Sequence, residues 1–315
     1  MSLRSVAATD VPRKQGEADV PATERRNPHT LLIDTFETRG LIEMLLTEDA
    51  RAVTAAMSAI SAIVQAVDEA LPRIAGGGRV HYFGAGASGR LAMLDASEVT
   101  PTFGVERGTF VSHFPGGTAG VVDSSIDLED SEDLGWADAA GLDATSVAIG
   151  ITASGSTAYV AGALRRAADV GALTILITSD PDAPLRDLVQ IAVVADTGPE
   201  ALTGSTRLKA GTATKVILNA FSTALMVRFG RTYSNLMVGA VPTNDKLRKR
   251  AISSLVQATG MSEADCRHAL RESDGDVRVA IVALMTGATP TTARETLSTS
   301  STVREAIAHL GKTAP

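Results

Sequence analysis

The chain has 315 residues, enough for one large α/β domain with or without a small appendage. Its formal net charge of −7, with no long run of Lys or Arg, gives no reason to expect nucleic acid or an anionic membrane as a partner. The strongly apolar stretches fall short of the roughly 18 residues that span a bilayer, and no signal-peptide hydrophobic region opens the chain. Cys266, the one cysteine, excludes an intramolecular disulfide framework. We expect a soluble cytoplasmic protein.

The first part of the chain is a polar segment followed by helices. Residues 1–22 lack periodicity and predict a disordered tail. Between Leu41 and Val64, apolar residues recur at helix-face spacing, and Gly76–Gly78 ends this pattern. We expect these helices to cover one face of a sheet or to pack against a second subunit.

From Arg79 the chain alternates short β runs with helical stretches. The β runs are Val80–Phe83, Thr109–Phe114, Ser146–Thr152, Leu173–Thr178 and Gln190–Val194. Several are apolar throughout, as strands buried on both faces are. The pattern predicts a five-stranded parallel α/β sheet sandwiched by helices, with ligands at the carboxyl ends of the strands.

The last part of the chain lacks β runs. A long helix is expected from about Ser205 to Phe229, and capping signals at 259–263 and 273–276 predict tight turns between further helices. We therefore expect three parts: the tail (1–22), the α/β domain with its N-terminal helices (23–244), and a small C-terminal helical bundle (245–315).

The stretch that joins the first β run to its helix is rich in glycine. Gly84, Gly86 and Gly89 form a strand-to-helix turn, which offers backbone N–H groups and the positive end of a helix to an anion. Ser88 adds a hydroxyl where the helix begins, and Pro101 is expected to end the helix. The turn predicts an anion cradle, although a tight turn without a ligand stays possible.

The same glycine spacing matches a dinucleotide-binding fingerprint. That use requires an acidic residue for the ribose at the end of the next strand. The next β run ends in Pro115–Gly117 instead. We therefore do not expect a nicotinamide or flavin cofactor.

A second turn follows the third β run, over Thr152–Thr157. Ser154, Ser156 and Thr157 place hydroxyls around Gly155, beside the N-terminus of the next helix. One such turn is weak evidence, because Ser and Thr are ordinary N-caps. Two turns at the ends of two strands of one parallel sheet indicate a phosphorylated small molecule.

A third cluster lies at the start of the long helix. Ser205, Arg207 and Lys209 place a hydroxyl and two cations there, although a basic residue in the first turn opposes the helix dipole. The two cations are either solvated surface charges or partners of a ligand phosphate or carboxylate.

Two carboxylates are candidates for catalysis. Glu98 precedes the expected helix end, where the helix dipole disfavours a negative charge and so suits a general acid. Glu129 lies in an acidic run that by itself is more often a solvated helix face. The remaining candidates are isolated and expected to be structural: His81, His113 and Cys266. No grouping has metal-ligand spacing, so we expect no metal site.

These motifs resemble those of the N-acetylmuramic acid 6-phosphate etherases, bacterial cell-wall recycling enzymes built on a sugar-isomerase (SIS) domain. The matching stretches are Thr23–Pro28, Gly84–Gly104, Ile151–Thr157, Leu202–Lys215 and Ser234–Val238. With the C-terminal helices, the resemblance covers about residues 23 to 290. Two departures are the Leu-Glu-Asp-Ser sequence around Glu129, where Gly-Ala-Glu-Asp-like residues are common, and residues 1–22, which lack a counterpart.

The resemblance implies a carbon–oxygen lyase that needs no cofactor. It would convert N-acetylmuramic acid 6-phosphate to N-acetylglucosamine 6-phosphate and D-lactate by elimination and hydration. By position, Glu98 corresponds to the proton donor for lactate and Glu129 to the second catalytic carboxylate, with base at C2 as its natural role. SIS proteins are commonly dimers, so we expect a homodimer. The expected substrate-binding residues, including the third cluster, are Gly86, Ala87, Ser88, Ser154, Gly155, Ser156, Thr157, Ser205, Arg207 and Lys209.

Two alternatives stay open at this point. One is a non-catalytic phosphosugar-binding regulator similar to the vertebrate glucokinase regulatory protein, which is larger, has a duplicated sugar-binding domain and lacks a counterpart of Glu98. The other is a phosphosugar isomerase, whose ring-opening and proton-shuttle residues we cannot place in this sequence.

Overall fold

The computed structural model describes residues 20–123, 128–240 and 244–311. Most of the predicted tail, residues 1–19, lies outside this part of the chain. Its last residues enter a short 3₁₀ helix, η1 (Ala22–Glu24), in which Ala22 is buried. A second such turn, η2 (Ile33–Thr35), precedes the first α-helix.

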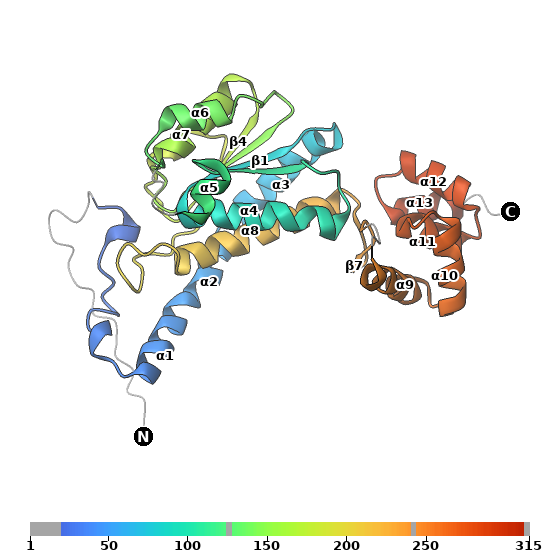
Figure 1. Cartoon of the computed structure of the whole chain (residues 1–315), viewed down its shortest axis with the longest axis horizontal. Coiled ribbons are helices and arrows are strands. Elements are labelled where there is room, and N and C mark those ends of the chain that lie inside the picture. Colours follow the sequence, from blue (N-terminus) through green and yellow to red (C-terminus); the bar gives the residue numbers. More distant parts are fainter. Residues whose placement is uncertain (1–19, 124–127, 241–243, 312–315) are drawn as a thin grey trace.

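The predicted five-stranded parallel sheet is confirmed. Its strands are β1 (Val80–Gly84), β2 (Phe110–His113), β3 (Val147–Ile151), β4 (Leu173–Thr178) and β5 (Ile191–Val194). They lie in the order β2-β1-β3-β4-β5 and every pair is parallel (Figure 1). Strands β1, β3 and β4 are fully buried, as their uninterrupted apolar sequences require.

Helices cover both faces of the sheet. The first face packs against α2 (Arg51–Ser58), α3 (Ile60–Ala75), α4 (Gly86–Phe103) and α8 (Lys209–Arg228). The second face packs against α6 (Glu132–Asp138), α7 (Ala158–Asp169) and η3 (Pro184–Leu188). Alternation along β1 serves both cores, since Tyr82 belongs to the first and Phe83 to the second.

The connections change faces between β1 and β3. Helix α4 follows β1 on the first face, whereas α7 follows β3 on the second. The two strands are neighbours, and their last residues, Gly84 and Ile151, are paired. Ligands of open α/β sheets bind where the connections diverge in this way. The carboxyl ends of β1 and β3 are therefore the place where the fold builds a site.

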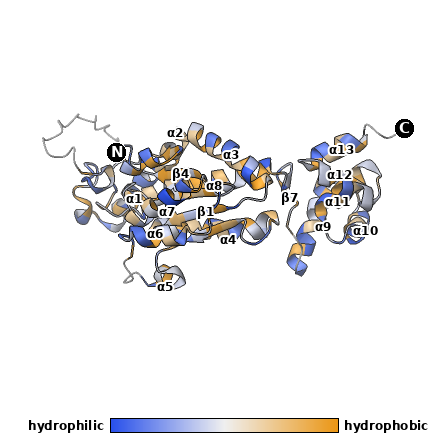
Figure 2. Cartoon of the chain, turned by 90° about the horizontal axis from the view of Figure 1, so that it is seen from above, coloured by the Kyte–Doolittle hydropathy of each residue, from blue (hydrophilic) through white to orange (hydrophobic). Residues whose placement is uncertain are grey.

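The N-terminal helices extend α1 (Thr38–Asp49) into α2 and α3, and they pack on α8 and on the sheet. Hydrophobic residues also occur on the outer side of α2 and α3, at the margin of the molecule in Figure 2. The exposed large apolar residues of α1, α2 and α3, at helical spacing within each helix, are Ile42, Leu46, Val53, Met57, Ile60 and Val64. We call this set the apolar stripe.

Helix α8 corrects the expectation that no apolar stretch reaches the length of a membrane span. By length and composition alone α8 could cross a bilayer, as could the bent run of α1–α3. In the fold, however, 56% of the α8 window is buried, with Ile217, Leu218 and Leu225 in the first core. A core helix of a soluble protein passes the same test of length and composition.

Two helix boundaries differ from the sequence prediction. Helix α4 continues through Pro101 to Phe103, and Gly104 ends it in the left-handed conformation with a φ of 62°. Proline is tolerated there because its missing N–H removes one hydrogen bond from the last turn only. Helix α8 begins at Lys209, not at Ser205.

The C-terminal part has a hydrophobic core of its own. A small hairpin of β6 (Thr232–Tyr233) and β7 (Leu236–Met237) leads into five helices, which gather to one side of the sheet domain in Figure 1. These are α9 (Asp245–Thr259), α10 (Glu263–Glu272), α11 (Val277–Thr286), α12 (Pro290–Thr299) and α13 (Val303–Gly311). The predicted turns are present: Ser262 caps α10 and Asp276 caps α11. The domain boundary at 244/245 stays a prediction.

In the sheet domain, residues 117–122 form one more short helix, α5 (Gly117–Val122), between β2 and β3.

Candidate active site

The first anion cradle lies where β1 leads into α4. A Cβ on Gly89 would lie 2.3 Å from the carbonyl oxygen of Gly84, so only glycine allows this close approach of helix to strand. Gly86 adopts a φ of 53°. In the described part of the chain, no side chain caps α4 and no acidic residue lies in its first turn. The N–H groups of Gly86, Ala87 and Ser88 have no acceptor inside the helix, and so they suit an anion.

The second cradle is a cluster of hydroxyls between β3 and α7. Thr152 Oγ1 lies 2.8 Å from Thr157 Oγ1, and Ser154 Oγ lies 2.9 Å from Ser156 Oγ. Gly155 has a φ of 67°, and a Cβ there would lie 2.1 Å from the Cβ of Ala183. The pairing of β1 with β3 places this turn beside the first cradle. The two turns together offer hydroxyl and N–H donors without a carboxylate, as a phosphate requires.

Thr152 is a member of this cluster that the sequence did not single out as a site residue. Its side chain is buried, and besides Thr157 it lies 3.3 Å from Ser154 Oγ and accepts the N–H of Gly155 at 3.2 Å. It therefore holds the two more accessible hydroxyls in place. Its position inside the turn was the available signal.

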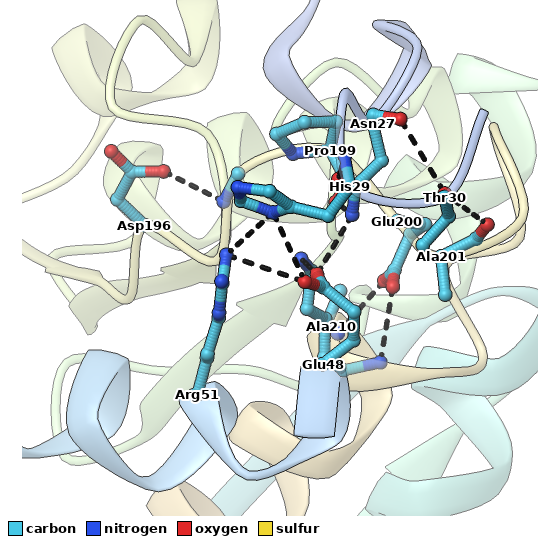
Figure 3. A network of polar contacts seen from close by, with 12 residues as sticks. Asn27, His29, Thr30, Glu48, Arg51, Asp196, Pro199, Glu200, Ala201 and Ala210 are labelled. Atoms are coloured by element: carbon cyan, nitrogen blue, oxygen red, sulfur yellow. Dashed lines mark hydrogen bonds and ion pairs between the residues drawn. The ribbon is translucent and has the colours of Figure 1, made fainter. Parts of the chain in front are cut away.

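The third cluster differs from the two cradles because the protein supplies its own anions (Figure 3). Lys209 is 2% exposed, and its Nζ lies 2.7 Å from Oε2 of Glu48 on α1. The carboxylate of buried Glu200 accepts the N–H groups of Lys209 and Ala210 at 3.2 and 2.9 Å. The dipole and the cation at the start of α8 are thus compensated by Glu48 and Glu200, without a ligand.

Glu48 is the centre of this network. Its carboxylate accepts a hydrogen bond from Asn27 Nδ2 at 2.7 Å, and His29 Nδ1 and Arg51 Nη1 lie 3.2 and 3.4 Å away. Burial raises the pKa of Glu48, but the hydrogen bonds from Lys209 and Asn27 and the nearby cations outweigh it and hold this pKa below its ordinary value. The network ties the N-terminal segment to α1 and α8, and no local sequence pattern indicated it.

Arg207 differs from Lys209 because no acidic side chain of the described residues forms an ion pair with it. It is exposed and precedes α8, and it lines a pocket of about 430 Å³ together with Ala87 of the first cradle. Ser205 is partly buried in the same loop, where its N–H donates to Leu202. The structure therefore brings Arg207 near the first cradle and buries Lys209 in an ion pair.

The two candidate carboxylates lie in different places. Glu129 is exposed, and its backbone oxygen accepts the N–H of Tyr159 at 2.9 Å in the first turn of α7, beside the second cradle. Glu98 is exposed on α4, ten residues after Ser88. Because α4 is unbroken, these two residues are about 15 Å apart along its axis.

A buried carboxylate that the sequence analysis did not weigh lies one turn before Glu98. Asp95 accepts hydrogen bonds from Tyr82 Oη at 2.9 Å and from Ser222 Oγ at 3.0 Å. Burial raises the pKa of Asp95, although the two hydrogen bonds oppose this shift. Asp95 thereby fastens the middle of α4 to β1 and α8.

His81 and His113 are not isolated, contrary to the sequence prediction. Nδ1 of His81 lies 3.0 Å from Nε2 of His113, and the His113 ring stacks on Phe83. Burial lowers the pKa of His81 to about 4. In the described residues, no three His, Cys, Asp or Glu side chains are grouped to hold a metal ion.

The chain is similar to several known proteins. Residues 62–168 match the family described as the glucokinase regulatory protein N-terminal SIS domain. An N-acetylmuramic acid 6-phosphate etherase of Thermobifida fusca is 50% identical over 264 residues, which are 84% of this chain and 87% of that protein. The etherase of Yersinia pestis is 43% identical over 87% of this chain and 94% of its own. A phosphoheptose isomerase structure from Francisella tularensis covers 61% of this chain and 100% of its own, at 18% identity and a TM-score of 0.48. Because these two etherases are 50% and 43% identical to it over most of its length, the chain belongs to the N-acetylmuramic acid 6-phosphate etherase family.

Proposed function

We propose that this protein cleaves the D-lactyl ether of N-acetylmuramic acid 6-phosphate, giving N-acetylglucosamine 6-phosphate and D-lactate. The relatives named for this activity, at 50% and 43% identity, favour it over the regulator alternative. The observation in the structure that carries it is the pair of adjoining cradles at the ends of β1 and β3, which offer donors and no carboxylate to a sugar phosphate.

The chemistry is an elimination followed by a hydration, which makes the enzyme a carbon–oxygen lyase. In the open-chain sugar, the C1 aldehyde acidifies the proton on C2. Glu129 removes this proton, the electron pair forms the C2–C3 double bond, and the C3–O bond breaks while Glu98 protonates the departing lactate oxygen. Water then adds its oxygen to C3 and C2 regains a proton, so the two steps together consume one water.

We propose further that the enzyme is a homodimer in which each site uses the partner's Glu98. A helix that ended early would have brought Glu98 of the same chain nearer to Ser88, but α4 runs unbroken through both residues. The apolar stripe supports association, since six exposed apolar side chains at helical spacing are the kind of surface that a second copy covers.

The first experiment is incubation with N-acetylmuramic acid 6-phosphate and measurement of D-lactate release. We expect release, with unphosphorylated N-acetylmuramic acid a very poor substrate. Binding of the phosphosugar without release of lactate would support the regulator instead. Equal turnover of the two sugars would show that the cradles do not bind the sugar phosphate. We place this reaction in the cytoplasm, in the recycling of cell-wall amino sugars.

The second experiment tests the shared site. Glu98→Gln and Ser154→Ala are each expected to be inactive or nearly so, and mixing them with subunit exchange should restore part of the activity. One of the two sites in the mixed dimer then has the partner's Glu98 and an intact cradle. If subunit exchange is verified and no activity returns, each site must use Glu98 and both cradles of the same chain.

A further inference from the structure

The pocket that Arg207 shares with the first cradle is lined mainly by the first two turns of α4 and of α8. Arg90 and Ala87 contribute from α4, and Thr212 and Lys215 contribute from α8. The pocket volume, about 430 Å³, exceeds what one small carboxylic acid fills. Ala87 adjoins Ser88, so the pocket and the phosphate cradle share one turn of backbone.

The charges of this pocket are one-sided. Three cations line it, and no acidic side chain among the described residues does. Across residues 20–123, 128–240 and 244–311, neither Arg207 nor Lys215 has an ion pair. Two acids lie nearby, outside the lining of the pocket. Asp49 accepts the Thr212 hydroxyl at 3.0 and 3.1 Å, and buried Asp95, which interacts electrostatically with Lys215, accepts hydrogen bonds from Tyr82 and Ser222.

The adjacent pocket, around Lys209, differs from this one in its charges. Arg207 lines both pockets. The adjacent one also contains Glu48, Asp49 and Glu200 around Lys209, whose charge is neutralised by Glu48. The same helix terminus thus has one side on which acids and cations are paired, and one side on which the described lining of the cavity contains cations and no acid. An anionic group of a ligand fits the second side only.

We propose that Arg207 and Lys215 bind the lactyl carboxylate of the substrate. This rests on the proposed function. The substrate has two anionic groups, a phosphate on C6 and a carboxylate on the lactyl ether. The hydroxyl and N–H cradles suit the phosphate, whereas a guanidinium and an ammonium group that line a mainly apolar pocket suit a carboxylate.

A consequence for specificity follows. When the lactyl carboxylate is converted to an amide, as when a peptide is attached, it loses its charge. The two cations would then be desolvated without a partner. The pocket therefore selects substrates whose lactyl group is free, and Arg207 and Lys215 are its specificity-determining residues.

The experiment compares N-acetylmuramic acid 6-phosphate with its lactyl carboxamide, by measuring release of N-acetylglucosamine 6-phosphate, the product that both share. For the wild-type protein we expect kcat/KM on the amide to be lower by on the order of ten- to a hundredfold. In Arg207→Gln/Lys215→Gln, the free acid should lose a similar factor, the amide should change little, and the preference should fall to within about threefold. Lys246→Gln, an exposed lysine on α9, is the matched charge control.

The outcomes separate the pocket from the proposed function. A preference for the free acid that persists in the double variant would overturn the carboxylate assignment. So would a double variant that stops discriminating phosphorylated from unphosphorylated sugar. If the wild-type protein turns over neither compound, the proposed function fails. The pocket is then tested by binding: D-lactate should stabilise the wild-type protein against unfolding, and D-lactamide should not. The double variant should lose the stabilisation by D-lactate if the pocket binds the carboxylate. Since both side chains lack ion pairs in the described chain, each single variant, Arg207→Gln and Lys215→Gln, serves as a folding check.

Discussion

The first turns of α4 and α8 lie on the same face of the sheet, and they show two ways of completing a helix N-terminus. A turn that contains glycine leads into each: Gly84 precedes α4 and Gly204 precedes α8. At α8, Glu200 accepts two N–H groups and Glu48 pairs with Lys209. At α4, no described side chain does either. The difference teaches that a helix start becomes a ligand site only where the protein leaves its donors for the ligand.

The largest expected effect comes from giving α4 the acid that α8 has. Ser88→Asp places a carboxylate in the first turn of α4, where it takes up the N–H donors and repels the phosphate. We expect kcat/KM to fall by about 10³-fold or more. The free energy of unfolding should rise by about 0.3–1 kcal/mol, because the acid complements the helix dipole.

Ser88→Ala is the matched control for that change, since it removes one hydroxyl and leaves the terminus open. Its loss in kcat/KM should be smaller, about ten- to a hundredfold. Equal losses in the two variants would show that the charge at this position is unimportant.

The second effect comes from opening the terminus of α8. Glu48→Gln leaves the buried Lys209 ammonium without its counter-charge, and we expect the free energy of unfolding to fall by about 3–5 kcal/mol in denaturant titration. Glu48→Gln/Lys209→Met should recover much of this loss, because it removes both charges. A double variant no more stable than Glu48→Gln would mean that the ion pair is not what holds this end of α8.

A smaller effect is expected at the cap itself. Glu200→Gln keeps an oxygen that accepts one N–H but loses the charge, so the free energy of unfolding should fall by about 0.5–2 kcal/mol. Burial raises the pKa of Glu200, although the two N–H groups and the Lys209 ammonium group oppose this shift. Arg207 and its pocket should keep their preference for the free lactyl group in this variant. Loss of that preference would mean that Glu200 also affects ligand binding in the pocket of Arg207.

The smallest effect is a dependence of stability on pH that comes from Glu48 at the start of α8. The folded-state pKa of Glu48 lies below its ordinary value of 4.5, so its stabilising contribution is fully present above that value and is lost as the pH falls through the folded pKa. Unfolding of wild-type protein and of Glu48→Gln between pH 5 and about 3 measures this difference. We expect the Glu48→Gln curve to fall less steeply. Parallel curves would contradict the assigned direction.

The sequence predicted those features that depend on neighbouring residues. The five strands, the glycine turns, the cap at Ser262 and the turn at 273–276 are all local signals, and all were correct. The end of α4 was misplaced because Pro101 marks a helix end only when no further turn can close, and Gly104 closes one.

What the sequence could not predict depends on contacts between distant residues. Lys209 meets Glu48 across 161 positions. Lys215 was passed over as an interior residue of an apolar helix, because only the packing of α8 against α4 turns it toward a pocket. The pairing of His81 with His113 required the positions of β1 and β2 in the sheet.

The unbroken course of α4 also sets a rotational phase. One helix holds a donor turn at Ser88, a buried anchor at Asp95 and an exposed acid at Glu98. Inserting a single residue between Ser88 and Asp95 would advance everything beyond it by about 1.5 Å and turn it by roughly 100°. Asp95 would leave Tyr82 and Ser222 in the same step that moves Glu98 from its outward direction. The number of residues between Ser88 and Asp95 therefore cannot change by even one without separating the donor turn from its anchor.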